Sequence, residues 1–144
     1  MTNPATETSG IRGVHLSSLY LWSCSVERMD AARIDRGAVT GSLSLTPEVS
    51  DESLTYQIAA TYKFMNSDEG EMATIVATYV AEYYGKSVPK LTNEQLERFS
   101  KSVILHVTPF LREFIATMMN RLGLPDFYLP LMRRSELEIE RAPS

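Results

Sequence analysis

Apolar and polar residues alternate along several stretches before residue 85, and this period of two predicts β-strands. The clearest stretch is LTYQIAATYKFM, residues 54–65, whose apolar side chains take every second position and so fall on one face of a strand. The next stretch, EMATIVATYVAEYY (71–84), carries β-branched and aromatic residues on both faces, so we expect neighbours on each side. NSDEG, residues 66–70, has the length and composition of a hairpin loop between them.

Two earlier stretches predict further strands. Residues 39–45 alternate as a short, half-buried strand, which we expect Pro47 to end. VHLSSLYLWSCSVERM (14–29) presents one face of Tyr20, Trp22, Cys24 and Val26, and there we interpret Cys24 as a buried structural thiol. DAARIDRGAVTG, residues 30–41, interrupts the alternation and is interpreted as a crossover loop.

The apolar period changes after Pro89 to the spacing of a helix. Thr92 followed by Gln95 has the form of a capping box that starts the helix. The apolar positions then form a wide stripe: Leu96, Phe99, Val103, Val107, Leu111, Phe114, Met118 and Leu122, flanked by Ile104, Leu105, Phe110, Ile115 and Met119.

Prolines and a glycine shape this helix. Pro109 has no N–H to donate toward Leu105, so we expect it to kink the helix or to restart it with Thr108 as the cap. Gly123 suits the position after the last turn, and Pro125 prevents continuation.

Four strands followed by a helix predict an α+β protein, with a four-stranded antiparallel sheet and one long kinked helix packed on one face. We expect a disordered tail at residues 1–10, one domain at 11–132 and a short charged tail at 133–144.

The predicted elements carry more apolar surface than one sheet–helix interface can bury. Monomers rarely expose such surface, so we predict self-association, with part of the surplus available as a groove for an extended apolar partner. The residues expected at the oligomer interface are Tyr20, Trp22, Val107, Phe110, Leu111, Phe114 and Met118. LPDFYLP, residues 124–130, is bounded by prolines and is therefore expected to be an extended arm, either a packing arm or a wall of such a groove.

Composition narrows the class of function. The net charge of −4 and pI near 5.2 argue against nucleic-acid binding, which needs a concentrated basic face. No window approaches the ~18 uninterrupted apolar residues of a membrane span, and the polar first ten residues lack the form of a signal peptide. A single cysteine fits a reducing compartment, so we expect a cytoplasmic protein.

The chemistry-bearing residues do not form a catalytic pattern. His15 and His106 lie far apart in the sequence, no ligand-spaced metal cluster occurs, and no glycine-rich phosphate loop is present. Glu27, Asp30 and Asp35 are interpreted as a solvated acidic loop rather than paired catalytic carboxylates. We therefore expect no catalytic residues, no metal and no cofactor.

Residues 41–130 resemble the SecB family of export chaperones and the short SecB-like proteins associated with toxin–antitoxin systems. The resemblance rests on GSLSLTPEVSDESLTYQIAATYKF, on EMATIVATYVAEYY and above all on TPFLREFIATMMNRLGLPDFYLP. In the last of these, the residues at the family's motif positions are Pro109, Phe110, Arg112, Glu113, Met118 and Arg121.

The resemblance implies a dimer of dimers with helices between the sheets, and grooves that hold non-native polypeptides without ATP or metal. The groove residues that it implies are Ile34, Val39, Leu43, Leu45, Phe127 and Leu129. Clients would be preproteins, as in export, or an antitoxin.

Some positions depart from the family pattern. The crossover loop lacks the family's tryptophan, and the last helix is reduced to RRSELEIERAPS. Acidic positions that export members use to bind the SecA motor correspond to Ser23 and Ala77, with only Glu27 retained, so we do not expect strong SecA binding. The main alternative is a homo-oligomeric scaffold that kept the fold and lost the groove. A small-ligand-binding domain or enzyme is a third alternative, supported only by generic pocket potential.

Overall fold

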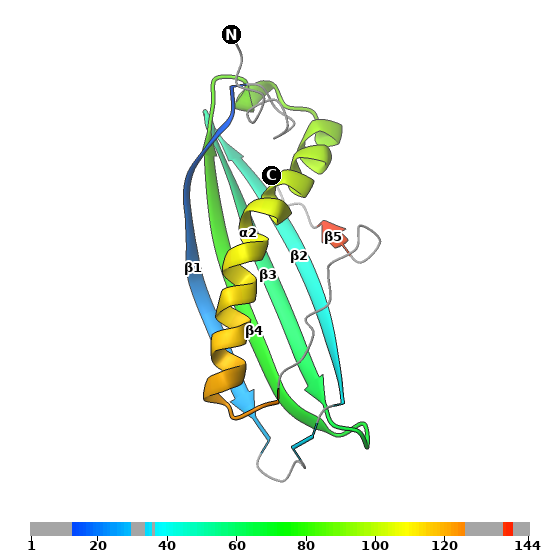
Figure 1. Ribbon diagram of the computed structural model, residues 1–144. Coiled ribbons are helices and arrows are strands. Elements are labelled where there is room, and N and C mark those ends of the chain that lie inside the picture. The colour runs from blue at the N-terminus through cyan, green and yellow to red at the C-terminus, as the bar shows by residue number, and fades with distance from the viewer. Residues whose placement is uncertain (1–12, 30–33, 36, 126–136, 140–144) are drawn as a thin grey trace.

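A computed structural model describes residues 13–29, 34–35, 37–125 and 137–139. Its elements follow the predicted order of four strands and then a long helix (Figure 1). Their bounds are β1 His15–Arg28, β2 Ala38–Ser50, β3 Ser53–Met65, β4 Glu71–Tyr84, the 3-10 turn η1 Val88–Lys90, α2 Asn93–Arg121 and β5 Leu137–Ile139.

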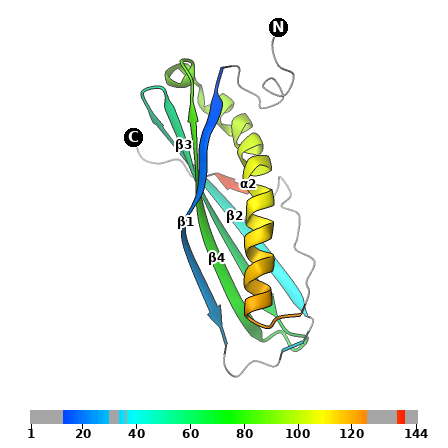
Figure 2. The same cartoon turned by 60° about the vertical axis from the view of Figure 1, so that its left-hand side comes forward.

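The strands form one sheet in the order β1-β4-β3-β2-β5. The first four strands are antiparallel neighbours, as predicted, whereas β5 adds to β2 in the parallel direction. This fifth strand was not expected, because residues 133–144 read as a charged tail. Figure 2 shows α2 on one face of the sheet, here called the helix face, while no described element covers the opposite, open face.

The helix face is the core of the chain. The even-numbered residues of β3 from Leu54 to Phe64 are buried there, as are the odd-numbered residues of β4 from Ala73 to Tyr83. The period of two predicted both sets correctly. Tyr83 lies at the centre of an aromatic cluster, with ring centroids 4.8 Å from Phe99 and 6.3 Å from Tyr56.

Strand β1 departs from strict alternation. Its register against β4 shifts between Leu16 and Ser18 and again between Leu21 and Ser23, and an extra residue in one strand moves later side chains to the other face. Tyr20 therefore lies opposite Val80 on the open face, whereas Cys24 lies opposite Ala77 of the helix face. The prediction of one shared face for Tyr20, Trp22, Cys24 and Val26 was wrong, and so was that of a buried thiol, because Cys24 is exposed.

Strand β2 continues through Pro47, which was expected to end it. Pro47 lies opposite Tyr56 of β3 and is buried on the helix face. Prolines in sheets are found near edges, and the pairing of β5 with Leu43–Leu45 leaves the edge side of Pro47 without a described strand.

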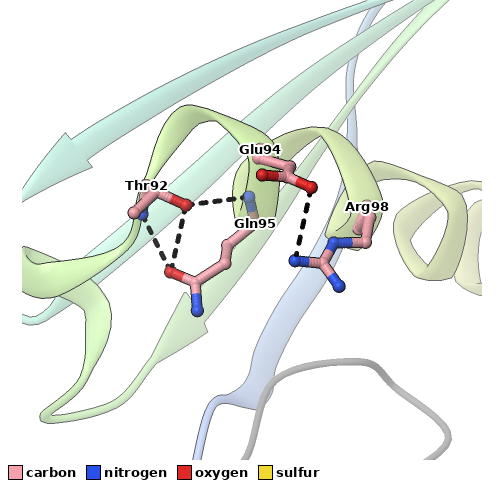
Figure 3. Close-up of polar contacts among 4 residues, drawn as sticks. All are labelled: Thr92, Glu94, Gln95 and Arg98. Atoms are coloured by element: carbon pink, nitrogen blue, oxygen red, sulfur yellow. Dashed lines mark hydrogen bonds and ion pairs between the residues drawn. The ribbon is translucent and has the colours of Figure 1, made fainter.

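The start of α2 is fixed by the predicted capping box (Figure 3). Thr92 Oγ1 accepts a hydrogen bond from the Gln95 backbone N–H at 3.2 Å, and Gln95 Oε1 accepts one from the Thr92 N–H at 2.9 Å. These bonds satisfy backbone donors that the first turn leaves without helical partners. Glu94 and Arg98 form an exposed ion pair at 3.9 Å one turn apart.

Pro109 lies inside a continuous helix of 29 residues, so of the two predicted alternatives, a kink or a restart at Thr108, the restart was wrong. The Thr108 hydroxyl instead donates to the Ile104 carbonyl at 2.6 Å. Figure 1 shows the axis of α2 changing direction partway along, as expected when a proline removes one helical hydrogen bond.

The C-terminal end of α2 is held to the sheet. Gly123 follows the last turn with φ of 69°, the left-handed conformation that glycine adopts without a Cβ penalty. Arg28, at the end of β1, donates from Nη1 to the Leu122 carbonyl at 2.7 Å. A cation at this end also complements the negative end of the helix dipole.

Candidate peptide-binding edge

The edge of β2 is the candidate site, because it takes up an additional extended segment. Residues Leu43, Ser44 and Leu45 lie opposite Leu137, Glu138 and Ile139 of β5 in parallel register. β2 has 13 residues and β5 has three, so β5 pairs with only a short part of the strand. A sheet edge presents backbone N–H and C=O groups to any extended chain that lies beside it.

The predicted groove residues lie at or near this edge. Leu43 and Leu45 are 3% and 0% exposed and belong to the apolar core, with Leu45 opposite Ile58 of β3. Val39 is half-buried opposite Phe64, and Ile34 is a half-buried residue packed against the same core. Phe127 and Leu129 lie outside the described residues. Val39 is therefore the groove residue on β2 with apolar surface left for a partner.

A shallow hollow of about 230 Å³ lies beside the same part of β2. The residues that line it are Thr40, Gly41, Ser42, Thr61 and Lys63. Thr40 lies opposite Lys63, and Ser42 opposite Thr61, so the hollow lies on the open face and is lined by hydroxyl-bearing residues and a lysine. The β2 edge thus separates an apolar helix face from a polar open face.

A second exposed surface lies on β1, which is the other edge of the sheet. Trp22 is 64% exposed and Tyr20 is 39% exposed, with ring centroids 6.4 Å apart. Glu82 of the neighbouring strand accepts a hydrogen bond from the Ser18 hydroxyl at 2.6 Å. Two large aromatic side chains on an edge strand are typical of a protein–protein contact.

The residues of α2 predicted at the oligomer interface divide into two sets. Val107 and Leu111 are 0% and 3% exposed and pack into the core of their own chain. Phe110 is 52% exposed, and Phe114 and Met118 follow it at four-residue spacing as half-buried residues. Val107 and Leu111 are buried by their own chain, so they need no partner subunit. On α2, the interface prediction therefore rests on Phe110, Phe114 and Met118.

A pair of polar side chains links the sheet to the helix beside the aromatic cluster. The Tyr83 hydroxyl shares a hydrogen bond with Nδ1 of His106 at 2.8 Å. Burial raises the pKa of Tyr83, and burial also lowers the pKa of His106 below its usual value. Both groups are therefore held in their neutral forms at neutral pH, which suits a structural pair between β4 and α2.

A larger hollow of about 500 Å³ opens at the end of the sheet where β1 begins. The residues that line it are Gly13, His15, Glu52, Tyr84, Gly85, Lys86 and Ser87. Over the described part of the chain, no three side chains of metal-ligating type come together. Among the same residues, no helix is both long and apolar enough to cross a membrane.

The three positions that the sequence resemblance equates with SecA-binding acids lie on different faces of the sheet. Ala77 is completely buried on the helix face, whereas Ser23 is exposed opposite Thr78 on the open face. Glu27 is exposed near the end of β1. These three positions therefore do not make up one acidic surface.

The sequence pattern missed β5, although a signal for it was present. Residues 135–141 read SELEIER, in which Leu137 and Ile139 alternate with glutamates in the period of a strand. The high charge of the segment concealed an alternation that covers only two apolar residues.

No protein-family model matches the chain, and no curated protein sequence matches it. A search of solved structures finds the Mycobacterium tuberculosis SecB-like chaperone Rv1957, in complex with a ChAD peptide from the HigA1 antitoxin Rv1956. The similarity has a TM-score of 0.63 and 17% sequence identity, and it covers 85% of this chain and 92% of that chain. The chain therefore has a SecB-like fold, which confirms the fold that the sequence resemblance implied.

Proposed function

We propose that this protein is an ATP-independent chaperone of the holdase type, which binds non-native polypeptide along the edge of β2. The observation that carries the proposal is the addition of β5 to β2 beside Leu43 and Leu45, because it places an extended segment against the edge. Strand addition gives affinity through main-chain hydrogen bonds that do not depend on client sequence. The similarity in fold to a chaperone bound to an antitoxin peptide supports the same function.

The client is a non-native preprotein or an antitoxin segment. The antitoxin peptide bound by the similar chaperone favours the second of these. Strong binding to SecA is not expected, because Ser23 is uncharged and Ala77 is buried. A pull-down in which SecA is retained tightly would overturn that expectation.

The active form is a homotetramer in the cytoplasm, assembled as a dimer of dimers. Exposed Trp22 and Tyr20 on β1 and exposed Phe110 on α2 support two separate contact surfaces, one on the sheet edge and one on the helix. Several β2 edges in one oligomer would increase the avidity for a long unfolded chain.

The function is tested by suppression of aggregation when a chemically unfolded protein is diluted without nucleotide. We expect suppression near one oligomer per client, and a loss of it in the variant Val39→Thr, which keeps shape but adds a hydroxyl. The matched control is Val49→Thr, the same substitution at an exposed position of β2 that lies beyond Pro47. Equal suppression by both variants would contradict the assignment of Val39 to the groove. No suppression by the wild type would contradict the holdase function.

A homo-oligomeric scaffold is the second candidate function. It is favoured by the burial of Leu43 and Leu45, which leaves these two predicted groove residues without exposed surface. A scaffold would form the same oligomer but would capture no unfolded polypeptide at any concentration.

A further inference from the structure

The pairing of β5 with β2 has features of an occupied binding site. β5 lies far from β2 in the sequence and approaches it in the parallel direction, unlike every other strand pair in the sheet. Its register places Leu137 opposite Leu43 and Ile139 opposite Leu45, so residues of apolar type occupy paired positions two residues apart. A segment with any sequence can form main-chain bonds, but this register also pairs residues of the same apolar type.

β5 is also a weak strand. It has three residues, fewer than the five or six of an average strand. Its central residue is Glu138, and glutamate is depleted in strands. A longer extended segment with β-branched or aromatic residues would pair more strongly with the same edge.

Among the described residues, the ladder between β2 and β5 could be extended in one direction only. Pro47 lies two residues beyond Leu45 on the same side of the strand and has no N–H to offer. Toward the start of β2, Ala38 to Ser42 lie outside the ladder with β5. A client strand would therefore extend past β5 over these residues and gain main-chain hydrogen bonds that β5 does not make.

We propose that β5 occupies the client-binding site of its own chain. A client strand would add to β2 in parallel at Leu43–Leu45 and displace β5. Such a client would carry apolar residues two positions apart. The inference rests on the proposed holdase function. It specifies that the β2 edge selects an apolar-x-apolar strand, and that pairing with β5 regulates client binding. Client binding and β5 pairing are mutually exclusive. The apparent affinity for client is therefore the intrinsic affinity multiplied by the fraction of molecules in which the edge is free.

The main test compares three chains. The full chain, a chain lacking residues 137–144 and a chain lacking only residues 140–144 are titrated against a fluorescently labelled protein kept unfolded by reduction and carboxymethylation. If β5 occupies the edge in about nine molecules of ten, removal of 137–144 strengthens binding about tenfold. Removal of 140–144 leaves β5 and deletes one acid and one base, so its affinity should stay within about twofold of the full chain.

A second experiment keeps the chain at its full length and strengthens β5, so client binding should become weaker instead of stronger. Glu138→Thr places a good strand former at the centre of β5 and should weaken client binding by up to about fivefold. Glu138→Gln is the control for loss of charge and should lie near the wild type. This experiment remains informative if the shortened chain is poorly soluble.

A labelled peptide with the sequence of residues 133–144 completes the experiment. It should bind the shortened chain and be released by the unfolded client, whereas a scrambled peptide should not bind. Equal client affinity of the full and shortened chains, with no release of the peptide, would overturn this inference while leaving the holdase function standing. No capture of client by either chain would overturn both.

Discussion

Phe110 and Leu111 are neighbours on α2 with different environments, and their truncation separates the core from the proposed interface. Leu111 is 3% exposed in its own chain, whereas Phe110 is 52% exposed. We therefore predict that Leu111→Ala lowers the free energy of unfolding by about 2–5 kcal/mol, the usual cost of removing a buried leucine side chain. Phe110→Ala should instead act on the association of subunits.

The size of the association effect follows from the exposed area. A phenylalanine side chain buries about 200 Å², so an exposed fraction of 52% corresponds to roughly 100 Å² available to a partner. At about 25 cal/mol per Å², its burial contributes about 2.5 kcal/mol per copy. A two-fold contact contains two copies, so Phe110→Ala should weaken that contact by about 5 kcal/mol, which exceeds a thousandfold in Kd.

The assay is sedimentation velocity over a range of protein concentrations, combined with urea unfolding of each variant. Thr117→Ala is the control, because Thr117 is an exposed polar residue further along the same helix. We expect Phe110→Ala to shift the mass toward the smaller species while the chain stays folded, and Thr117→Ala to behave as the wild type. An unchanged oligomer in Phe110→Ala, at concentrations where the wild type begins to dissociate, would refute the interface assignment.

Three further predictions concern the stability of the chain, each followed by urea unfolding. Tyr83→Phe removes the hydrogen bond with His106 and should cost about 1 kcal/mol; an unchanged midpoint would mean the bond contributes nothing. Burial lowers the pKa of His106 in the folded state. The stability that neutral His106 contributes is therefore fully present above its unfolded pKa of 6.5, and it decreases as the pH falls from there toward the folded pKa. His106→Gln should flatten this acid-side decline, and an identical slope in the variant would count against it. Thr92→Ala should cost about 1 kcal/mol through loss of the cap, whereas Thr92→Ser should retain most of it.

The parts of the fold that could be predicted are those governed by local periodicity. The alternation in β3 and β4 and the four-residue spacing along α2 each identify the buried face, because a single element decides which side chains share a face. The capping box at Thr92 is equally local. For these features, the sequence of each single element was enough to predict the buried face or the cap.

The errors arose where a neighbouring strand decides the outcome. The side of Cys24 depends on a register shift between β1 and β4, which the sequence of β1 alone does not contain. The continuation of β2 through Pro47 depends on β2 lying next to the edge, which is a property of strand order.

The assignment of Val39, Leu43 and Leu45 to a client-binding groove stays a prediction, and the strand beside them was not foreseen. The resemblance placed the groove at Val39, Leu43 and Leu45, and the structure brings all three to the helix face of β2. The occupation of that edge by β5 could not be inferred, because three residues with two apolar side chains give too weak a pattern to separate from a charged tail.

The central claim is that this chain holds polypeptides in a non-native state. The most direct measurement is equilibrium binding, without nucleotide, of one labelled polypeptide presented in parallel as an unfolded and as a native chain. Our account predicts capture of the unfolded form alone, by the chain of 144 residues and more tightly by the chain lacking residues 137–144. Capture of neither form by either protein, both shown to be folded, would contradict it and would leave the scaffold as the function of this fold.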